Sequence, residues 1–169
     1  MPVPPQTPRR KHLRIRGYDY SIPGYYFITI CAHQRQLLLT RMDVCAAVTT
    51  AWLALPCRFP SVRLDAFVVM PNHVHGIVIL MADGGPSLGQ VLRAFKSISA
   101  IAANRLLGRC GEPLWQRNYY ERVIRREREL EHVREYIANN PARWDDDQEN
   151  PAHWQMPPSR AQHARAPTR

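Results

Sequence analysis

The feature that most constrains this chain is a pair of apolar segments joined by Pro71-Asn72. Residues 62–70 end in a continuous apolar run, and residues 73–80 are apolar after a histidine pair, His73 and His75. Branched and apolar residues at this density favour strands, and the two-residue break predicts a tight antiparallel hairpin. Because side chains alternate between the faces of a strand, both histidines point to the same side of the predicted sheet.

Five further elements surround the hairpin. The pattern of apolar residues predicts strands over 25–32 and 114–124, and helices over 41–55, 87–107 and 127–139. Asp43 is expected to cap the first helix and Pro56 to end it. The order strand-helix-strand-strand-helix-strand-helix predicts an α+β fold of the ferredoxin-like plan. This is βαββαβ with one added C-terminal helix and an antiparallel sheet covered on one face.

Two segments outside this plan are too polar to build a core. Residues 1–17 form a basic arm, and residues 144–169 form a Pro- and Arg-rich tail that we expect to be flexible, although Trp144 and Trp154 could dock on the body. Residues 18–143 then form one domain, which is long enough to bury a proper core.

The charge of the chain indicates a polyanionic partner. There are 23 lysines and arginines against 14 aspartates and glutamates, a net charge of +9, and arginine suits bidentate contacts to phosphate. Nucleic acid is therefore the expected partner. No apolar run approaches the length of a membrane span, and no secretory signal is recognisable. The four cysteines form no C-x-x-C pair. We expect a cytoplasmic protein with reduced thiols and no membrane partner.

The histidine pair has two interpretations. His73 and His75 are either partly buried strand residues with ordinary hydrogen-bond partners or two ligands of one metal ion, because imidazoles on one face of a strand can hold a single ion. Two imidazoles do not complete a metal site. The second interpretation therefore requires a third ligand and a reacting group from elsewhere in the chain.

The last predicted helix offers both. Tyr136 and Asn140 are four residues apart, which makes them neighbours on a helix at the edge of its apolar stripe. An amide oxygen is a suitable ligand for magnesium or manganese, and a phenol can act as a nucleophile. Pro141 disfavours helical geometry at Asn140, which would loosen this relation. The alternative is a boundary tyrosine and an ordinary residue at a helix end.

Residues 115–122 indicate a surface for nucleic acid. Tyr119 and Tyr120 would face opposite sides of a strand, so one would face the core and the other solvent or a ligand, and both are competing candidates for the nucleophile. The side chains predicted to stack on bases or contact phosphates are Trp115, Gln116, Arg117, Tyr119, Tyr120 and Arg122. Plain strand packing is the alternative. The chain has no Walker loop and no G-x-S-x-G motif.

Three motifs in this order match a known family. They are Pro-Asn-His-Val-His-Gly at 71–76, Trp-Gln-Arg-Asn-Tyr-Tyr-Glu-Arg-Val-Ile-Arg at 115–125 and Tyr-Ile-Ala-Asn-Asn-Pro at 136–141, preceded by Arg-Gly-Tyr-Asp-Tyr at 16–20. Together they resemble the REP-associated tyrosine transposases, which are HUH-type single-strand transposases with two histidines around a bulky apolar residue. The resemblance runs from residue 9 to residue 143.

The resemblance implies an activity and a ligand set. A divalent metal, Mg²⁺ or Mn²⁺, would be held by His73, His75 and Asn140. Tyr136 would cleave and rejoin DNA through a 5′-phosphotyrosine link and a free 3′-OH. The substrates would be single-stranded DNA hairpins of repeated extragenic palindromes. Basic residues expected to hold the DNA backbone are Arg14, Arg16, Arg122, Arg125 and Arg126.

Two other functions fit the same residues. A non-catalytic nucleic-acid-binding module on a ferredoxin-like sheet would account for the charge and for the aromatic and basic segment. A metal-dependent phosphoesterase that uses water would account for the histidines without a role for Tyr136. The chain is compatible with a monomer or a homodimer, so the tyrosine and the metal ligands could come from one chain or from two.

Overall fold

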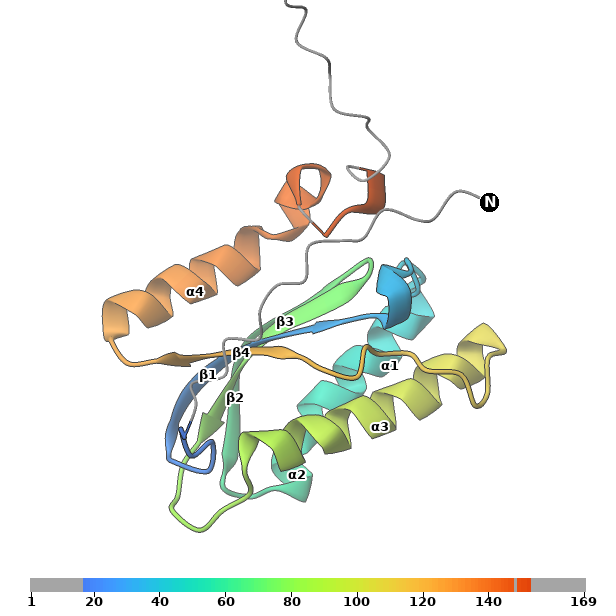
Figure 1. Ribbon diagram of the computed structural model, residues 1–169. Coiled ribbons are helices and arrows are strands. Elements are labelled where there is room, and N and C mark those ends of the chain that lie inside the picture. Colours follow the sequence, from blue (N-terminus) through green and yellow to red (C-terminus); the bar gives the residue numbers. More distant parts are fainter. Residues whose placement is uncertain (1–16, 148, 153–169) are drawn as a thin grey trace, which may run out of the picture.

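The computed structural model describes residues 17–147 and 149–152 (Figure 1). Its elements follow the predicted order, with three short helices added. They are β1 (Gly24–Cys31), η1 (His33–Arg35), α1 (Met42–Leu53), α2 (Leu55–Arg58), β2 (Val62–Met70), β3 (His73–Leu80), α3 (Leu88–Leu107), β4 (Tyr120–Ile124), α4 (Glu127–Asn139) and η2 (Pro141–Asp146). Arg14, Arg16 and Trp154, for which the sequence suggests roles, lie outside the described residues.

The strands form a single antiparallel sheet in the order β2-β3-β1-β4, which is the ferredoxin-like arrangement that the sequence predicts. The β2–β3 hairpin turns at Pro71-Asn72, so the histidine pair opens a central strand. The register of β1 on β3 places Thr29 opposite His75 and Cys31 opposite His73.

Helices cover both faces of this sheet. α1 and α3 pack on one face, where the main core includes Tyr26, Trp52 and Phe95 (Figure 1). α4 lies over the other face, held by a smaller apolar cluster that consists of Phe27, Ile77, Ile124, Leu130 and Ile137. The prediction of a sheet covered on one face is therefore incomplete. The second face is the one that carries the histidine pair, because His75 stacks on Phe27 with ring centroids 5.5 Å apart.

The glycine that follows His75 is required by packing. A Cβ atom added at Gly76 would lie 2.7 Å from Cη2 and Cζ2 of Trp52. The Trp52 ring is itself stacked on Phe67 of β2, with centroids 4.5 Å apart, so it has little room to withdraw. Gly76 therefore allows α1 to approach β3. The glycine of the motif is explained by packing in the main core, which lies on the sheet face opposite the histidines.

Two local predictions about the first helix differ from the structure. The segment 41–55 is divided between α1 and α2, and Pro56 occupies the first turn of α2, where its missing N–H is not needed. Asp43 is not the cap of α1, because the N-cap residue is Arg41. The carboxylate of Asp43 instead accepts a hydrogen bond from the N–H of Val44 and pairs with Arg41.

The chain beyond α4 packs against the body as far as it is described. η2 follows α4 directly, and the Trp144 ring lies beside His73 with centroids 6.2 Å apart. Glu149 and Asn150 are buried. Within residues 17–147 and 149–152, no helix combines the length and the apolar character that crossing a membrane would require.

Candidate active site

His73 and His75 converge on one point. Their Nε2 atoms lie 3.0 Å apart, with the two rings inclined at 73°, and both side chains are buried. In octahedral coordination, two neighbouring ligand atoms that each lie about 2.1 Å from the ion subtend a right angle and are about 3.0 Å apart. The spacing therefore fits two ligands of a single metal ion.

The second ring nitrogen of His73 is held by Asn72. The side-chain Nδ2 of Asn72 donates to two backbone carbonyls at 3.2 and 2.7 Å, so its Oδ1, 2.8 Å from Nδ1 of His73, is an acceptor. His73 must therefore carry a proton on Nδ1, which directs the lone pair of Nε2 toward His75. This is the tautomer that a metal ligand needs.

Thr29 holds the second histidine. Its hydroxyl lies 2.8 Å from Nδ1 of His75, across the β1–β3 pair. When the ring nitrogen that does not bind metal donates its N–H, as Nδ1 of His75 can to the Thr29 hydroxyl, the hydrogen bond orients the imidazole and raises its basicity as a ligand. Both histidines therefore have the kind of supporting hydrogen bond that metal-binding histidines use.

Asn140 is the candidate third ligand. It is buried and lines a pocket of about 520 Å³ together with His75 and Tyr136. Asn140 keeps helical geometry, with φ −59° and ψ −43°, because Pro141 begins a 3-10 turn that continues the helical path. The expected loosening of the helix at Asn140 does not occur. Among residues 17–147 and 149–152, no three histidine, cysteine or carboxylate side chains are grouped closely enough to hold a metal.

Tyr136 lies at the edge of the same pocket. Its phenolic oxygen is 3.4 Å from Nε2 of His75, and its ring meets Phe27 edge-on with centroids 6.1 Å apart. The residue is 46% exposed, whereas the histidines beside it are buried. The phenol is thus accessible to a large substrate and adjacent to the nitrogens that would bind metal.

The position of Tyr136 follows from how α4 docks. Leu130 and Ile137 bury against the sheet, as their spacing predicts, and this places the Tyr136 side chain beside the start of β3. A polar contact also holds α4 on the sheet, because the guanidinium of Arg134 donates three hydrogen bonds to the carboxylate of Asp65 on β2.

Residues of η2 and of the segment after it also reach the site, and the sequence-based reasoning missed them. Asp147 places Oδ2 3.8 Å from Nε2 of His73, and the pocket is lined further by Asp146, Glu149 and Arg143. Carboxylates beside two imidazoles favour a cation. No local signal identifies these residues, because an acidic run after a proline is typical of a solvated loop.

A second pocket begins at Tyr136 and contains part of the predicted nucleic-acid surface, namely Tyr120, Arg122 and Arg125. Trp115 does not belong to this surface. It is only 5% exposed, its Nε1 donates to the hydroxyl of Ser99, and its ring packs near Phe95. The prediction that Trp115 stacks on bases is therefore wrong, because its ring is part of the core.

The other residues of that segment take different positions. Tyr119, which precedes β4, packs against the main core, whereas Tyr120, the first residue of β4, faces α4, so the two neighbours point to opposite sides as predicted. Gln116 and Arg117 precede β4, and their carbonyl oxygens accept hydrogen bonds from Nζ of Lys96 at 2.6 and 2.9 Å. Burial lowers the pKa of Lys96.

Comparisons with known proteins show which family and fold the chain resembles. The family described as "Transposase IS200 like" matches residues 23–140. An uncharacterized protein of Haemophilus influenzae is 32% identical, over 82% of this chain and 92% of the relative.

Two solved structures are similar. One is a REP-associated tyrosine transposase bound to a REP hairpin, with a TM-score of 0.59 and 26% identity over 75% of this chain and 70% of that chain. The other is a putative transposase from Deinococcus radiodurans, which has a TM-score of 0.51 and 22% identity over 73% of this chain and 94% of that chain. The second likeness concerns the fold alone.

Proposed function

Because the chain belongs to the IS200-like transposase family, we propose that it is a metal-dependent transposase that cleaves and rejoins single-stranded DNA at palindromic hairpins of the REP type. The observation that carries this proposal is the position of Tyr136, whose phenolic oxygen lies 3.4 Å from Nε2 of His75. A nucleophile and two candidate ligand nitrogens thus meet at one place. The relative solved with a bound REP hairpin supports the choice of substrate.

The proposed reaction exchanges one phosphoester bond for another. The phenolic oxygen of Tyr136 attacks the scissile phosphorus while the bond from phosphorus to O3′ breaks. The phenol loses its proton, and the departing O3′ gains one. The 5′ phosphate stays on the tyrosine, and attack by a 3′-OH on this phosphotyrosine reverses the step and joins strands. Since one phosphoester bond forms for each one that breaks, the reaction needs no ATP.

His73, His75 and Asn140 would hold the divalent ion, Mg²⁺ or Mn²⁺. When bound, the ion polarises the phosphate and stabilises the charge that develops on its oxygens. Asn72 and Thr29 would keep the imidazoles oriented toward the ion through the 2.8 Å contacts to their Nδ1 atoms.

The net charge of +9 supports a polyanionic substrate. We assign DNA contacts to the pocket residues Tyr120, Arg122 and Arg125. Further backbone contacts are proposed for Arg14, Arg16, Gln116 and Arg117.

The test is covalent capture of DNA. Wild-type protein, with Mn²⁺ and an end-labelled DNA hairpin that has single-stranded flanks, should give an adduct that survives denaturing electrophoresis. Tyr136→Phe should give none, and Tyr25→Phe, which alters another exposed tyrosine on the same sheet face, should behave as wild type.

Three outcomes would contradict the proposal. An adduct that persists in Tyr136→Phe would exclude this nucleophile. Cleavage without an adduct in both proteins would indicate a phosphoesterase that uses water. Hairpin binding without cleavage, together with no calorimetric signal for Mn²⁺, would indicate a non-catalytic binding module.

A further inference from the structure

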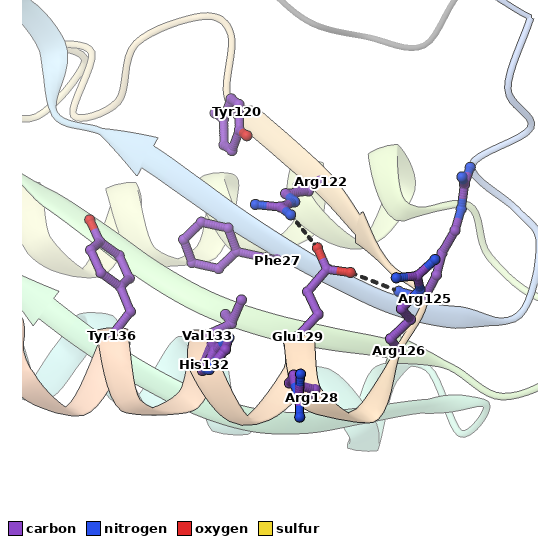
Figure 2. A pocket seen from close by; sticks show the side chains of 10 residues that line it. All are labelled: Phe27, Tyr120, Arg122, Arg125, Arg126, Arg128, Glu129, His132, Val133 and Tyr136. Atoms are coloured by element: carbon purple, nitrogen blue, oxygen red, sulfur yellow. Dashed lines mark hydrogen bonds and ion pairs between the residues drawn. The ribbon is translucent and has the colours of Figure 1, made fainter.

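A second pocket, of about 740 Å³, adjoins the candidate active site, and Figure 2 shows the side chains that line it. We call it the basic pocket, and the residues that matter are Phe27, Tyr120, Arg122, Arg125, Glu129 and Tyr136. Its volume is in the range of small-molecule sites. Tyr136 lines both this pocket and the one that contains His75 and Asn140. A DNA strand with its scissile phosphate at Tyr136 would therefore have the basic pocket within reach of an adjacent nucleotide.

The floor of the basic pocket is aromatic. Phe27 lies between Tyr120 and Tyr136, and both tyrosines meet it edge-on, at centroid distances of 6.3 and 6.1 Å (Figure 2). Phe27 is buried, but Tyr120 is 37% exposed, so its ring still has surface that a planar group can cover. Exposed aromatic rings of this kind are platforms for unpaired bases.

The wall of the basic pocket carries arginines, and one of them already forms an ion pair with a carboxylate. Arg122 of β4 is paired with Glu129 of α4, with Nη2 and Oε1 2.5 Å apart. The other carboxylate oxygen of Glu129 accepts a 3.3 Å hydrogen bond from the backbone N–H of Arg125. Figure 2 shows the carboxylate between these two groups. Carboxylate and phosphate use the same guanidinium and N–H donors, so a phosphate bound at these donors would compete with Glu129.

These observations lead to one inference, which rests on the proposed function. We infer that the basic pocket binds one unstacked nucleotide of the strand next to the scissile phosphate, with its base on Tyr120. Its phosphate takes the place of Glu129 on Arg122. Glu129 then sets the affinity of this subsite, because each bound strand must displace it from Arg122.

The base contact is tested by binding. The protein carries Tyr136→Phe throughout, so that no covalent complex forms. The probe is a fluorescent DNA hairpin with five thymidines on each end of its stem, compared with the same hairpin whose tails are abasic. Abasic tails should weaken binding by about fivefold or more, the lower range for a base stacked on an aromatic ring. Tyr120→Leu should abolish this difference, and Tyr25→Leu, which alters a tyrosine of equal exposure outside the pocket, should preserve it.

The phosphate contact is tested by salt. Glu129→Gln should strengthen binding of the tailed hairpin and steepen the dependence of log K on log salt by about 0.7, the value for one added phosphate contact on a single strand. Glu127→Gln removes an equal charge from an exposed residue on the same helix. This control should steepen the dependence of log K on log salt less than Glu129→Gln does. Arg122→Gln in the Glu129→Gln background should cancel the gain.

Each outcome has a distinct meaning. Thermal melting of every variant identifies unfolded proteins, and Tyr120→Phe, which keeps the ring, should bind as the parent does. The subsite is excluded if the hairpin binds but abasic tails weaken binding as much in Tyr120→Leu as in the parent protein. It is also excluded if Glu129→Gln changes affinity and salt dependence no more than Glu127→Gln does. In either case the proposed transposase activity stands. Failure of wild-type protein to form the Tyr136 adduct would instead refute the proposed function.

Discussion

Arg134 of α4 and Asp65 of β2 form a two-pronged ion pair, in which the guanidinium Nε and Nη2 atoms lie 2.6–3.2 Å from the carboxylate oxygens. The pair joins the helix that carries Tyr136 to an edge strand of the sheet. It lies two residues before the candidate nucleophile, so its loss affects how firmly that part of α4 is held.

We expect Asp65→Asn to lower the free energy of unfolding by less than about 1 kcal/mol at pH 7, because solvent screens the partly exposed pair. Hydrogen bonds from Arg134, followed by that from the N–H of Ala66, lower the pKa of Asp65. The unfolded chain therefore binds the proton more readily. The stabilisation is present above the ordinary aspartate pKa of about 3.9 and is lost as the pH falls through the lower folded value.

Urea unfolding at several pH values checks this prediction. The difference between wild type and Asp65→Asn should shrink below about pH 4. Glu127→Gln is the control, because Glu127 is highly exposed and reaches Arg134 only at 3.9 Å. A difference that stays constant down to pH 3 would show that the ion pair is not its cause.

Thr29→Val should reduce the affinity for Mn²⁺ by about 10- to 100-fold, the usual effect of losing a hydrogen bond that orients a metal ligand. Valine keeps the branched shape but cannot hold Nδ1 of His75. Titration calorimetry gives the affinity directly. Thr49→Val is the matched control, since the hydroxyl of Thr49 bonds to the Cys45 carbonyl within α1 and should leave Mn²⁺ binding unchanged.

The effect of a substitution at Asn140 on Mn²⁺ affinity should depend on whether the new side chain offers an oxygen ligand. Asn140→Asp keeps an oxygen ligand and should retain Mn²⁺ binding, whereas Asn140→Leu should lower the affinity by about tenfold or more because no hard ligand remains. Asn139→Leu, at an exposed neighbouring position, serves as the control. Equal Mn²⁺ affinities for Asn140→Leu and Asn139→Leu would remove Asn140 from the ligand set.

Gly76→Ala should destabilise the protein by about 1–3 kcal/mol, the usual effect of overpacking a core. The new methyl group would lie 2.7 Å from two atoms of the Trp52 ring. Chemical denaturation measures the effect. Combining Gly76→Ala with Trp52→Phe should reduce the added cost, because the smaller ring leaves space.

Gly89→Ala provides the contrasting case. Gly89 lies inside α3, and a methyl group there would meet nothing closer than the Tyr119 hydroxyl at 3.5 Å. Since alanine favours helix more than glycine does, this change should preserve or raise stability. Equal losses at both glycines would contradict the packing argument for Gly76.

Local patterns in the sequence determined the elements and the direction of several side chains. Alternation along a strand places His73 and His75 on one face, and helical spacing makes Tyr136 and Asn140 neighbours. The break at Pro71-Asn72 defines the hairpin, and the order of elements predicts the sheet. These inferences concern neighbours in the sequence, whose geometry depends little on the rest of the molecule.

Only the tertiary structure decided what those side chains meet. It buries Trp115 in the core, places Asp147 near His73, and pairs Arg122 with Glu129 in the basic pocket. It also keeps Asn140 helical in spite of Pro141. Such contacts join residues far apart in the chain or depend on how whole elements pack. The local pattern of apolar residues does not predict these contacts, because they depend on how α4 and the segment after it pack against one face of the sheet.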